Sequence, residues 1–356
     1  MSRLFFLTLA ASIAILALAG CKPPSGGTDS SEGVTRDPSG IVIPVPLPKR
    51  EVVAASRIIL CLSNATDPHQ RVQANLLADM LRATEGYELG FTDARGSAES
   101  QAAQLRTLAA SKPKAALILP VDAAAVKEEI SALRQAGTWV IGLDASLNDG
   151  TCDAVVYCDQ KKIGSAAGDL IVSALKRKAQ DSGATEVTGR VVQIQGDENH
   201  PACRARNEGF LAALKAQPGI VLVHDAPAKW DRANAALRFK EALNLQKNID
   251  AVYAHNDMMA MGVSEASLEK NVRENLLIVG TDGITGPGAG LQMLRRSQID
   301  ATIHHPLLVD FAWRIIEKMA KEPAFKPKAA YEIEPVAFTP KNLDERLSAG
   351  LPVPPL

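Results

Sequence analysis

Polar residues follow a series of short apolar runs, each at the point where the run ends. They are Ser63 and Asn64, Asp144, Gly196 and Asp197, His224 and Asp225, Asn256 and Asp257, Asp282, and His304 and His305. Carboxylates, amides and imidazoles at such positions could hydrogen-bond a polar ligand, hold a metal ion or move protons. Asp and Asn there could instead cap the helices that follow. Capping is a strong alternative for Asp122, Asp197 and Asp225, and a weaker one for Asn256, Asp257 and Asp282.

A catalytic or metal-binding use of these residues has limited support. His69, His304 and His305 with Asp67 could form a metal or acid–base site, but no HExxH or tightly spaced ligand motif is present. The glycine-rich segment 286–290 contains Pro287 and lacks a following Lys-Ser/Thr, which does not suit a phosphate cradle. We therefore expect a protein that is not an enzyme and has neither metal nor cofactor.

Alternating strand and helix patterns from residue 56 onward must position these side chains. Strands are predicted at 57–63, 87–92, 115–119, 138–143, 190–195, 220–224, 251–255 and 276–280. Helices are predicted at 67–84, 98–110, 123–136, 163–178, 202–216, 233–245 and 258–270. Repeated βα units with near-continuous apolar strands predict an α/β fold with two parallel sheets covered by helices on both faces. Ligands of such sheets bind at the carboxyl ends of strands, where the polar residues stand.

Composition and charge exclude several classes of protein. Of the 356 residues, 46% are hydrophobic and 22% are charged, which supplies a full core and rules out global disorder. The formal net charge of −1 argues against a nucleic-acid partner. Cys61, Cys152, Cys158 and Cys203 are expected to be small buried hydrophobes rather than disulfide partners, because a strand would separate Cys152 from Cys158 by roughly 20 Å.

The N-terminus has the pattern of an export signal. Arg3 precedes an apolar run that ends Leu18-Ala19-Gly20-Cys21, and this ending resembles the bacterial lipobox, in which the cysteine thiol is acylated. We predict a lipoprotein signal peptide at 1–20 and a lipidated Cys21; an ordinary signal peptide is the alternative. Of the 27 residues from Lys22 to Pro48, 14 are Gly, Pro or Ser, so residues 21–55 are expected to form a flexible tether.

Four segments resemble one family in order and spacing. They read RVVQIQGDENHPACRARNEGF at 190–210, DAVYAHNDMMAMG at 250–262, LIVGTDG at 277–283 and IDATIHH at 299–305. They are similar to bacterial periplasmic sugar-binding proteins of the ribose-binding type, whose type I fold also occurs in the effector domains of Lac-repressor-like regulators. The likeness covers about 56–340. An export signal stands where a regulator has its helix-turn-helix, which excludes the regulator.

The resemblance implies two similar doubly wound parallel-sheet lobes, joined by three crossovers, with one sugar in the cleft between them. The N-terminal lobe would comprise 56–158 plus 306–333. The C-terminal lobe would comprise 159–305 plus 334–340, and residues 341–356 would form a tail without a core pattern.

The resemblance also implies roles for individual residues. Arg204 is similar to an arginine that bonds two sugar oxygens, although a surface helix charge is the alternative. Asn256 in HND matches an asparagine that bonds ring hydroxyls, and Asp282 in TDG matches a carboxylate that accepts hydroxyl protons. Asp144, which closes TWVIGLD, matches a carboxylate of the N-terminal lobe. Trp230 in APAKWDRANA matches an aromatic that stacks on the sugar, a role that suits an indole face; Trp139 and Trp313 fit core positions.

Departures from the family pattern argue against ribose itself. Asp67-Pro68-His69-Gln70 stands where the family has Asn-Pro and two aromatics, so His69 and Gln70 make a stacking wall polar and Asp67 adds a carboxylate. Ala145 replaces an arginine, and His305 replaces a glutamine. Ser63 is a weaker candidate for the pocket.

The leading functional hypothesis is a monomeric substrate-binding lipoprotein of the cell envelope or periplasm. It would capture a monosaccharide or polyol for the membrane subunits of an ABC-type importer, and the lipid anchor would hold it at the membrane. The alternatives are a ligand-sensing lipoprotein that presents the sugar to a signalling receptor, and a metal-binding protein.

Overall fold

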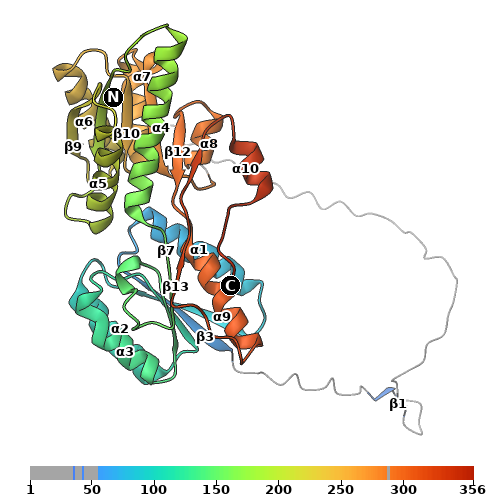
Figure 1. Ribbon diagram of the computed structural model, residues 1–356. Coiled ribbons are helices and arrows are strands. Elements are labelled where there is room, and N and C mark those ends of the chain that lie inside the picture. Colours follow the sequence, from blue (N-terminus) through green and yellow to red (C-terminus); the bar gives the residue numbers. More distant parts are fainter. Residues whose placement is uncertain (1–34, 37–41, 44–54, 287–288) are drawn as a thin grey trace, which may run out of the picture. The chain divides into compact units, whose positions relative to one another are not determined.

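The apolar runs form two six-stranded sheets in the computed structural model of the chain (Figure 1). The structure describes residues 35–36, 42–43, 55–286 and 289–356. The order of strands and helices follows the sequence-based prediction closely, and the α/β class with two parallel-dominated sheets is confirmed.

The first sheet is parallel throughout and has the order β13-β7-β6-β5-β3-β4. Its strands are β3 (Ser56–Leu62), β4 (Tyr87–Asp93), β5 (Ala115–Ile118), β6 (Trp139–Gly142), β7 (Ala154–Tyr157) and β13 (Ala330–Glu332). Side chains alternate between the faces: Ile58 and Leu60 lie in one apolar cluster, whereas Ile59 and Cys61 lie in another. A strand buried on both faces must be apolar at every position, which explains the unbroken run.

Helices cover both faces of this sheet. They are α1 (Pro68–Arg82), α2 (Ala98–Ser111), α3 (Lys127–Gln135) and α9 (Leu308–Lys321), with 3-10 turns η1 (Ala124–Val126) and η2 (Ala145–Leu147). Leu77 of α1 and Phe311 of α9 belong to the first cluster, and Leu105 of α2 and Ile130 of α3 to the other. Helix α9 follows the five parallel strands of the second sheet in sequence but packs on the first sheet.

The second sheet has the order β14-β12-β11-β10-β8-β9. Its strands are β8 (Gly189–Gln195), β9 (Ile220–Pro227), β10 (Ala251–Ala254), β11 (Leu277–Asp282), β12 (Ala301–His304) and β14 (Val336–Phe338). The edge strand β14 is antiparallel to β12, and the other pairs are parallel. Parallel ladders place the ends of β8, β10, β11 and β12 at one edge of the sheet.

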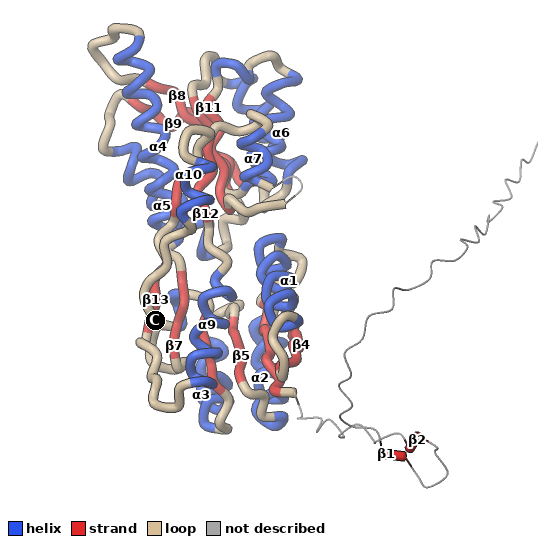
Figure 2. Tube along the Cα trace, turned by 90° about the vertical axis from the view of Figure 1, so that its right-hand side faces the viewer, coloured by secondary structure: helices blue, strands red, loops and turns tan. Residues whose placement is uncertain are grey.

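The second sheet is also covered on both faces. Its helices are α4 (Gln160–Asp181), α5 (Pro201–Lys215), α6 (Arg232–Leu245), α7 (Asp257–Glu269) and α8 (Gly290–Arg295), with the 3-10 turn η3 (Arg273–Asn275) and the later α10 (Leu343–Ala349). In Figure 2, α4 and α5 lie on one side of the strands and α6 and α7 on the other. Glycines let α4 and α5 approach closely: a Cβ on Gly164 would lie 1.9 Å from the carbonyl oxygen of Arg206.

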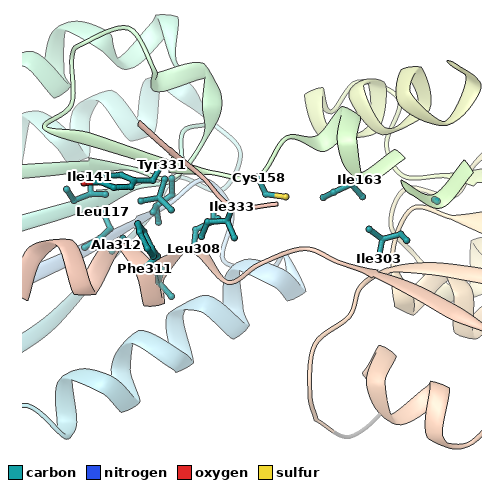
Figure 3. Close-up of a cluster of buried hydrophobic side chains, with 14 of the residues drawn as sticks. Leu117, Ile141, Cys158, Ile163, Ile303, Leu308, Phe311, Ala312, Tyr331 and Ile333 are labelled. Atoms are coloured by element: carbon teal, nitrogen blue, oxygen red, sulfur yellow. The ribbon is translucent and has the colours of Figure 1, made fainter. Parts of the chain in front are cut away.

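The chain passes between the sheets three times, from β7 to α4, from β12 to α9, and from β13 to β14. Buried Cys158, Leu308 and Ile333 stand at these passages (Figure 3). The passage from β12 to α9 begins at His304 and His305, so one connection between the sheets adjoins the polar strand-end residues.

The N-terminal part of the chain, before Ala55, is described only at residues 35–36 and 42–43. The predicted signal peptide and Cys21 lie outside the described residues, and residues 1–53 and 54–356 form separate units. Within the predicted tether, β1 (Thr35–Arg36) pairs antiparallel with β2 (Val42–Ile43). Among the described residues, no helix combines the length and apolar character needed to cross a membrane.

The C-terminal tail contains α10, which the sequence analysis did not predict. Buried Leu343 fixes this helix on the second sheet's core, and Leu356 packs against the first sheet's core. Lys328 Nζ donates to the carbonyl oxygen of Pro355 over 3.2 Å. A single buried leucine in a seven-residue helix gives too weak a periodic signal for sequence analysis to detect.

Cysteine and tryptophan placements largely follow expectation. Cys61, Cys152, Cys158 and Cys203 are free and buried, as predicted. Trp313 is 2% exposed and lies in the core. Trp139, predicted as core, is only partly buried, and the ammonium of Lys114 stands 3.7 Å from its ring centroid. The first residue of an inner strand lies at the sheet's rim, where a Lys stem and cation can cover an indole face.

Candidate functional site

The polar strand ends of both sheets line one cavity of about 140 Å³. An apolar cavity of about 150 Å³ holds benzene, so this space has room for roughly one six-membered ring. Seven of the eight residues predicted to contact a ligand line it: Asp67, His69, Asp144, Trp230, Asn256, Asp282 and His305. Ser63, the weaker candidate, also lines it. Arg204 does not; its neighbour on the same helix, Arg206, takes this place.

Helix geometry explains the difference between the two arginines. Cys203, Arg206, Gly209 and Phe210 share the buried face of α5, at the spacing of one helical stripe. Arg204 is exposed on another face, and its NH1 donates to the carbonyl oxygen of Asn199 over 2.6 Å. The sequence prediction assigned the sugar-bonding arginine to Arg204, whereas in the structure Arg206, and not Arg204, lines the cavity. The apolar stripe in PACRARNEGF was the signal that could have found it.

Arg206 is the main buried cation of the cavity, with 4% exposure. Its Nε donates to Gln160 Oε1 over 2.9 Å, NH1 donates to the carbonyl oxygen of His255, and NH2 lies 3.4 Å from His305 Nδ1. These contacts use three of the five N–H donors of a guanidinium. Two N–H donors therefore remain for a ligand.

His69 and His305 form a stacked pair at the cavity. Their rings are parallel to within 6° and their centroids lie 4.0 Å apart. His69 Nε2 lies 3.3 Å from the carbonyl oxygen of His305, and Gln73 Nε2 lies 3.4 Å from His69 Nδ1. A carbonyl accepts and an amide donates, so His69 carries its proton on Nε2. Burial lowers the pKa of His69 to about 4, against the opposing effect of Asp67, and lowers the pKa of His305 well below its usual value. Both rings are therefore neutral near pH 7.

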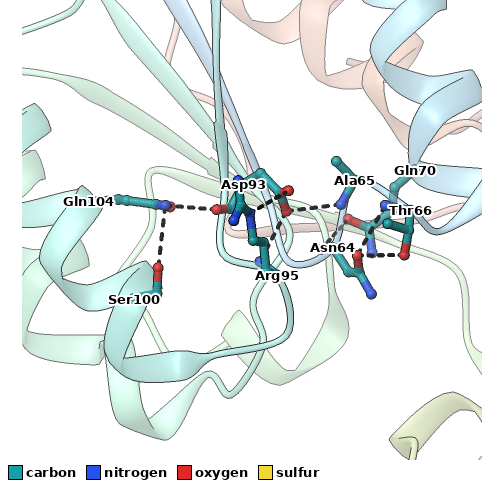
Figure 4. A network of polar contacts seen from close by, with 8 residues as sticks. All are labelled: Asn64, Ala65, Thr66, Gln70, Asp93, Arg95, Ser100 and Gln104. Atoms are coloured by element: carbon teal, nitrogen blue, oxygen red, sulfur yellow. Dashed lines mark hydrogen bonds and ion pairs between the residues drawn. The ribbon is translucent and has the colours of Figure 1, made fainter.

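Asp67 stands at the N-cap of α1, where its Oδ1 accepts from the backbone N–H of Gln70 over 2.8 Å. The loop before it is held by the network in Figure 4. There Asp93 Oδ1 accepts from the N–H groups of Ala65 and Arg95, each over 3.0 Å. Gln70 Oε1 accepts from the N–H of Ser63 over 3.1 Å. These bonds fix the chain between β3 and α1, and with it the carboxylate of Asp67.

Two further predicted residues also serve as helix caps. Asp144 Oδ1 accepts from the N–H of Ser146 over 2.8 Å at η2, and Asn256 Oδ1 accepts from the N–H of Met259 over 2.8 Å at α7. Both side chains nevertheless line the cavity. Capping uses one oxygen of each side chain, so the capping and ligand-contact interpretations are compatible. Asp122, in contrast, caps the turn at Ala124 and stands away from the cavity.

Trp230 forms an aromatic wall and depends on a glycine. A Cβ on Gly196 would lie 2.3 Å from Trp230 Cζ2, so the indole lies directly on the backbone of this strand end. Trp230 has a positive φ of 62°, and His200 meets its ring edge-on with centroids 5.8 Å apart. The Arg206 guanidinium carbon lies 5.7 Å from the Trp230 ring centroid. An apolar face thus adjoins strong donors, an arrangement that suits a ring with apolar faces and polar edges.

Asp282 has an unusual backbone and an unusual charge environment. Its φ is +113°, a region that costs a non-glycine residue about 1–3 kcal/mol. Burial, followed by the neighbouring carboxylate of Asp257, raises the pKa of Asp282 well above its ordinary value, while Arg206 opposes this. Strained backbone of this kind persists where the surrounding structure holds it, often at ligand sites.

Several cavity residues escaped sequence analysis. Gln73, Tyr157, Gln160 and His200 line the cavity besides Arg206. Gln73 and Gln160 lie in helices and His200 caps α5, away from the strand ends. Tyr157 ends β7, which is not among the predicted strands. Among the described residues, no group of three or more His, Cys, Asp or Glu side chains is arranged to hold a metal ion. The surroundings supply hydrogen bonds and an aromatic face.

Comparisons with known proteins point to one family. A family model described as the periplasmic binding protein domain matches residues 58–306. The ribose import binding protein of Escherichia coli strain K12 is 31% identical over 198 residues, which are 56% of this chain and 63% of that protein. The aligned part thus spans less than two thirds of that relative.

Solved structures share the fold. A periplasmic solute-binding protein of an ABC transporter from Actinobacillus succinogenes 130z, with bound D-allose, has a TM-score of 0.70 and 20% identity; the match covers 82% of this chain and 99% of that one. The fructose-binding periplasmic domain of a hybrid two-component system has a TM-score of 0.67 and 24% identity, covering 82% and 94%.

Proposed function

The chain belongs to the periplasmic binding protein family, and on this premise we propose that it captures a monosaccharide or a related polyol in the cell envelope. The bound ligand would pass to the membrane subunits of an ABC-type importer. The family is one of solute-binding proteins, and binding requires no covalent chemistry.

One observation carries this proposal: a cavity for roughly one ring that joins an indole face to the buried guanidinium of Arg206 and several carboxylates. Sugar hydroxyls donate to carboxylates and accept from guanidinium, and such charge-assisted bonds are stronger than neutral ones. The C–H face of a sugar or the carbons of a polyol would cover Trp230. Asp67, Asp144, Asn256, Asp282 and the neutral His69–His305 pair would bond the remaining hydroxyls.

The polar wall favours a ligand other than ribose. His69 stands where the family has an aromatic ring, and its ring nitrogens already contact the carbonyl oxygen of His305 and the amide of Gln73. Asp67 adds a carboxylate whose capping bond uses Oδ1. A buried polar group without a partner costs about 1–3 kcal/mol, so this carboxylate selects a ligand with a hydroxyl beside it. Hexoses and cyclic polyols carry more hydroxyls than a pentose does.

The test is a thermal-shift screen followed by calorimetry. The probes are D-ribose, D-allose, D-fructose, xylitol and myo-inositol, with maltose as a disaccharide control that exceeds the cavity. A ligand that binds only the folded form raises Tm. At a ligand concentration of 100 times Kd, the free energy of unfolding increases by about 2.7 kcal/mol. We expect at least one monosaccharide or polyol to raise Tm and Asp282→Asn to abolish the shift. Absence of any shift across the panel would contradict the proposed ligand class.

We further propose that a lipid on Cys21 anchors the protein. The residues Leu18-Ala19-Gly20-Cys21 support this, and a stable anchor keeps a binding protein close to its permease. Cys21→Ser should release the protein from the membrane fraction; retention with unchanged signal processing would contradict the anchor.

A further inference from the structure

Asp257 is a buried carboxylate that the cavity does not contact. It is 3% exposed, and it follows Asn256 at the start of α7. Its Oδ2 accepts from the backbone N–H of Gly283 over 2.8 Å, and its Oδ1 accepts from Thr302 Oγ1 over 2.7 Å. One side chain thus connects the end of β10 to the end of β11 and to β12.

Glycines on the neighbouring strand and helix leave room for this carboxylate. A Cβ on Gly280 would lie 2.3 Å from Asp257 Oδ1, and a Cβ on Gly290 would lie 2.0 Å from Oδ2. Two glycines therefore shape a niche that fits the carboxylate of Asp257 and would not accept a larger neighbour. A helix cap alone would not require this niche, because Asn256 already caps α7.

The backbone that Asp257 holds is the backbone that carries Asp282. Asp282 and Gly283 have consecutive positive φ values of 113° and 57°. The carbonyl oxygen of Asp282 accepts from the N–H of His305 over 3.0 Å, and His304 Nδ1 lies 3.0 Å from the carbonyl oxygen of Gly283. The N–H of Gly283 is held by the carboxylate of Asp257. Without this hydrogen bond, the backbone of Asp282 would relax from its positive φ, which is unfavourable for an L-residue.

We propose that Asp257 is the positioning residue for Asp282: it holds the Gly283 N–H so that the Asp282 carboxylate points into the cavity, and its own charge tunes that carboxylate. The role of Asp257 toward a ligand rests on the proposed function. Its hydrogen bond to Gly283 and its electrostatic effect on Asp282 can be tested without any ligand.

The electrostatics of the pair follow from its geometry. Burial raises the pKa of Asp257 to about 7, and burial together with Asp257 raises the pKa of Asp282 well above its ordinary value. Arg206 lowers the pKa of both groups, and Asp67 raises that of Asp282. His304, which bonds to the backbone here, has a pKa lowered by burial and stays neutral. Two interacting buried carboxyls titrate as a pair, so removal of one charge must change how the other titrates.

Two variants of Asp257 separate the clamp from the charge. In Asp257→Asn, the amide oxygen can accept from Gly283 and the amide N–H can donate to Thr302 Oγ1, so the clamp survives without its charge. Asp257→Ala removes both. Asp300→Ala is the matched control, because Asp300 Oδ2 accepts from the N–H of Ile278 over 2.8 Å at the opposite end of β11 and β12.

Three measurements on the full chain test the proposal. They are amide exchange at Gly283, carboxyl titration of Asp282 followed by carbon NMR and assigned with Asp282→Asn, and the Kd for D-allose and myo-inositol. We expect Asp257→Ala to speed Gly283 exchange by about tenfold and to weaken binding by about tenfold or more. Asp257→Asn should keep Gly283 protected and move the Asp282 titration to lower pH. Asp300→Ala should lower Tm and leave both signals unchanged.

Some outcomes would overturn the proposal. If Gly283 in Asp257→Ala exchanges at the wild-type rate, Asp257 does not hold its N–H. If the Asp282 titration is unchanged in Asp257→Asn, the two carboxyls are not coupled. Equal effects from Asp300→Ala would reduce Asp257 to a general stabilising residue. If neither probe binds the wild-type protein while the two NMR signals respond as expected, the fault lies with the proposed ligands and the positioning role stands.

Discussion

Replacement of Arg206 tests the cavity most directly. Arg206→Ala removes the donors that remain for a ligand, while Arg206→Lys keeps the charge and loses the fork that bridges Gln160 and the His255 carbonyl. A hydrogen bond to a charged group contributes about 1.5–3 kcal/mol, so loss of one or two weakens ligand binding by about 3 kcal/mol, on the order of 100-fold in Kd. The free energy of unfolding should change less than the free energy of binding. Gln160 Oε1 and the His255 carbonyl oxygen lose their donor, but the cost of burying a charge is also removed.

Arg204→Ala is the matched control on the same helix. Arg204 is exposed and contacts the carbonyl oxygen of Asn199, so its loss should leave Kd within about twofold of the wild-type value. Calorimetry with the sugar or polyol selected by the screen gives Kd, and thermal unfolding checks that each variant is folded. Wild-type affinity in Arg206→Ala together with lost binding in Arg204→Ala would refute the cavity assignment and restore the arginine predicted from sequence.

Further predictions concern fluorescence, pH and membrane attachment. Ligand should change the intrinsic fluorescence, Trp230→Phe should remove most of that change, and Trp139→Phe should leave it; the reverse pattern would place the stacking ring elsewhere. Trp230→Ala should weaken binding by about 1–3 kcal/mol through lost aromatic burial. Because burial lowers the pKa of His69 to about 4, the unfolded state takes the proton first, so stability from this group is complete above pH 6.5 and is lost as pH falls toward 4. His69→Phe should flatten Tm between pH 6.5 and 4, and an unchanged slope would contradict the buried neutral ring. Cys21→Ser should move the protein from the membrane fraction to the soluble fraction.

The arrangement of strands and helices was largely accessible from sequence, because each inner strand is an apolar run that only a doubly covered sheet can bury. Predicted strand 251–255 and observed Ala251–Ala254 differ by one residue. The antiparallel β14 and the helix α10 were less accessible, since three apolar residues or one buried leucine carry little periodic signal.

The site was accessible where strand ends define it, and was missed where a helix face defines it. Asp144 and Asn256 stand two residues after strands and Asp282 ends one, so their positions follow from parallel topology. Identifying Arg206 requires knowing which face of α5 is buried, because a shift of two residues moves a side chain to another face of a helix. Gln160 and His200 line the cavity through tertiary packing that their neighbours in sequence do not reveal.

The interleaving of the two sheets constrains how the chain folds. The apolar cluster that contains Ile58 and Leu60 also includes Phe311 and Trp313 of α9 and Tyr331 of β13, which are synthesised after all five parallel strands of the second sheet. Closure of a loop of some 150 residues between β7 and α9 carries an entropic cost that grows with the logarithm of loop length. Until that loop closes, the face of β3 that bears Ile58 and Leu60 has α1 as a covering helix but lacks α9. The N-terminal half therefore completes its core last, and truncation before Tyr331 should expose apolar surface in both halves rather than release one folded half.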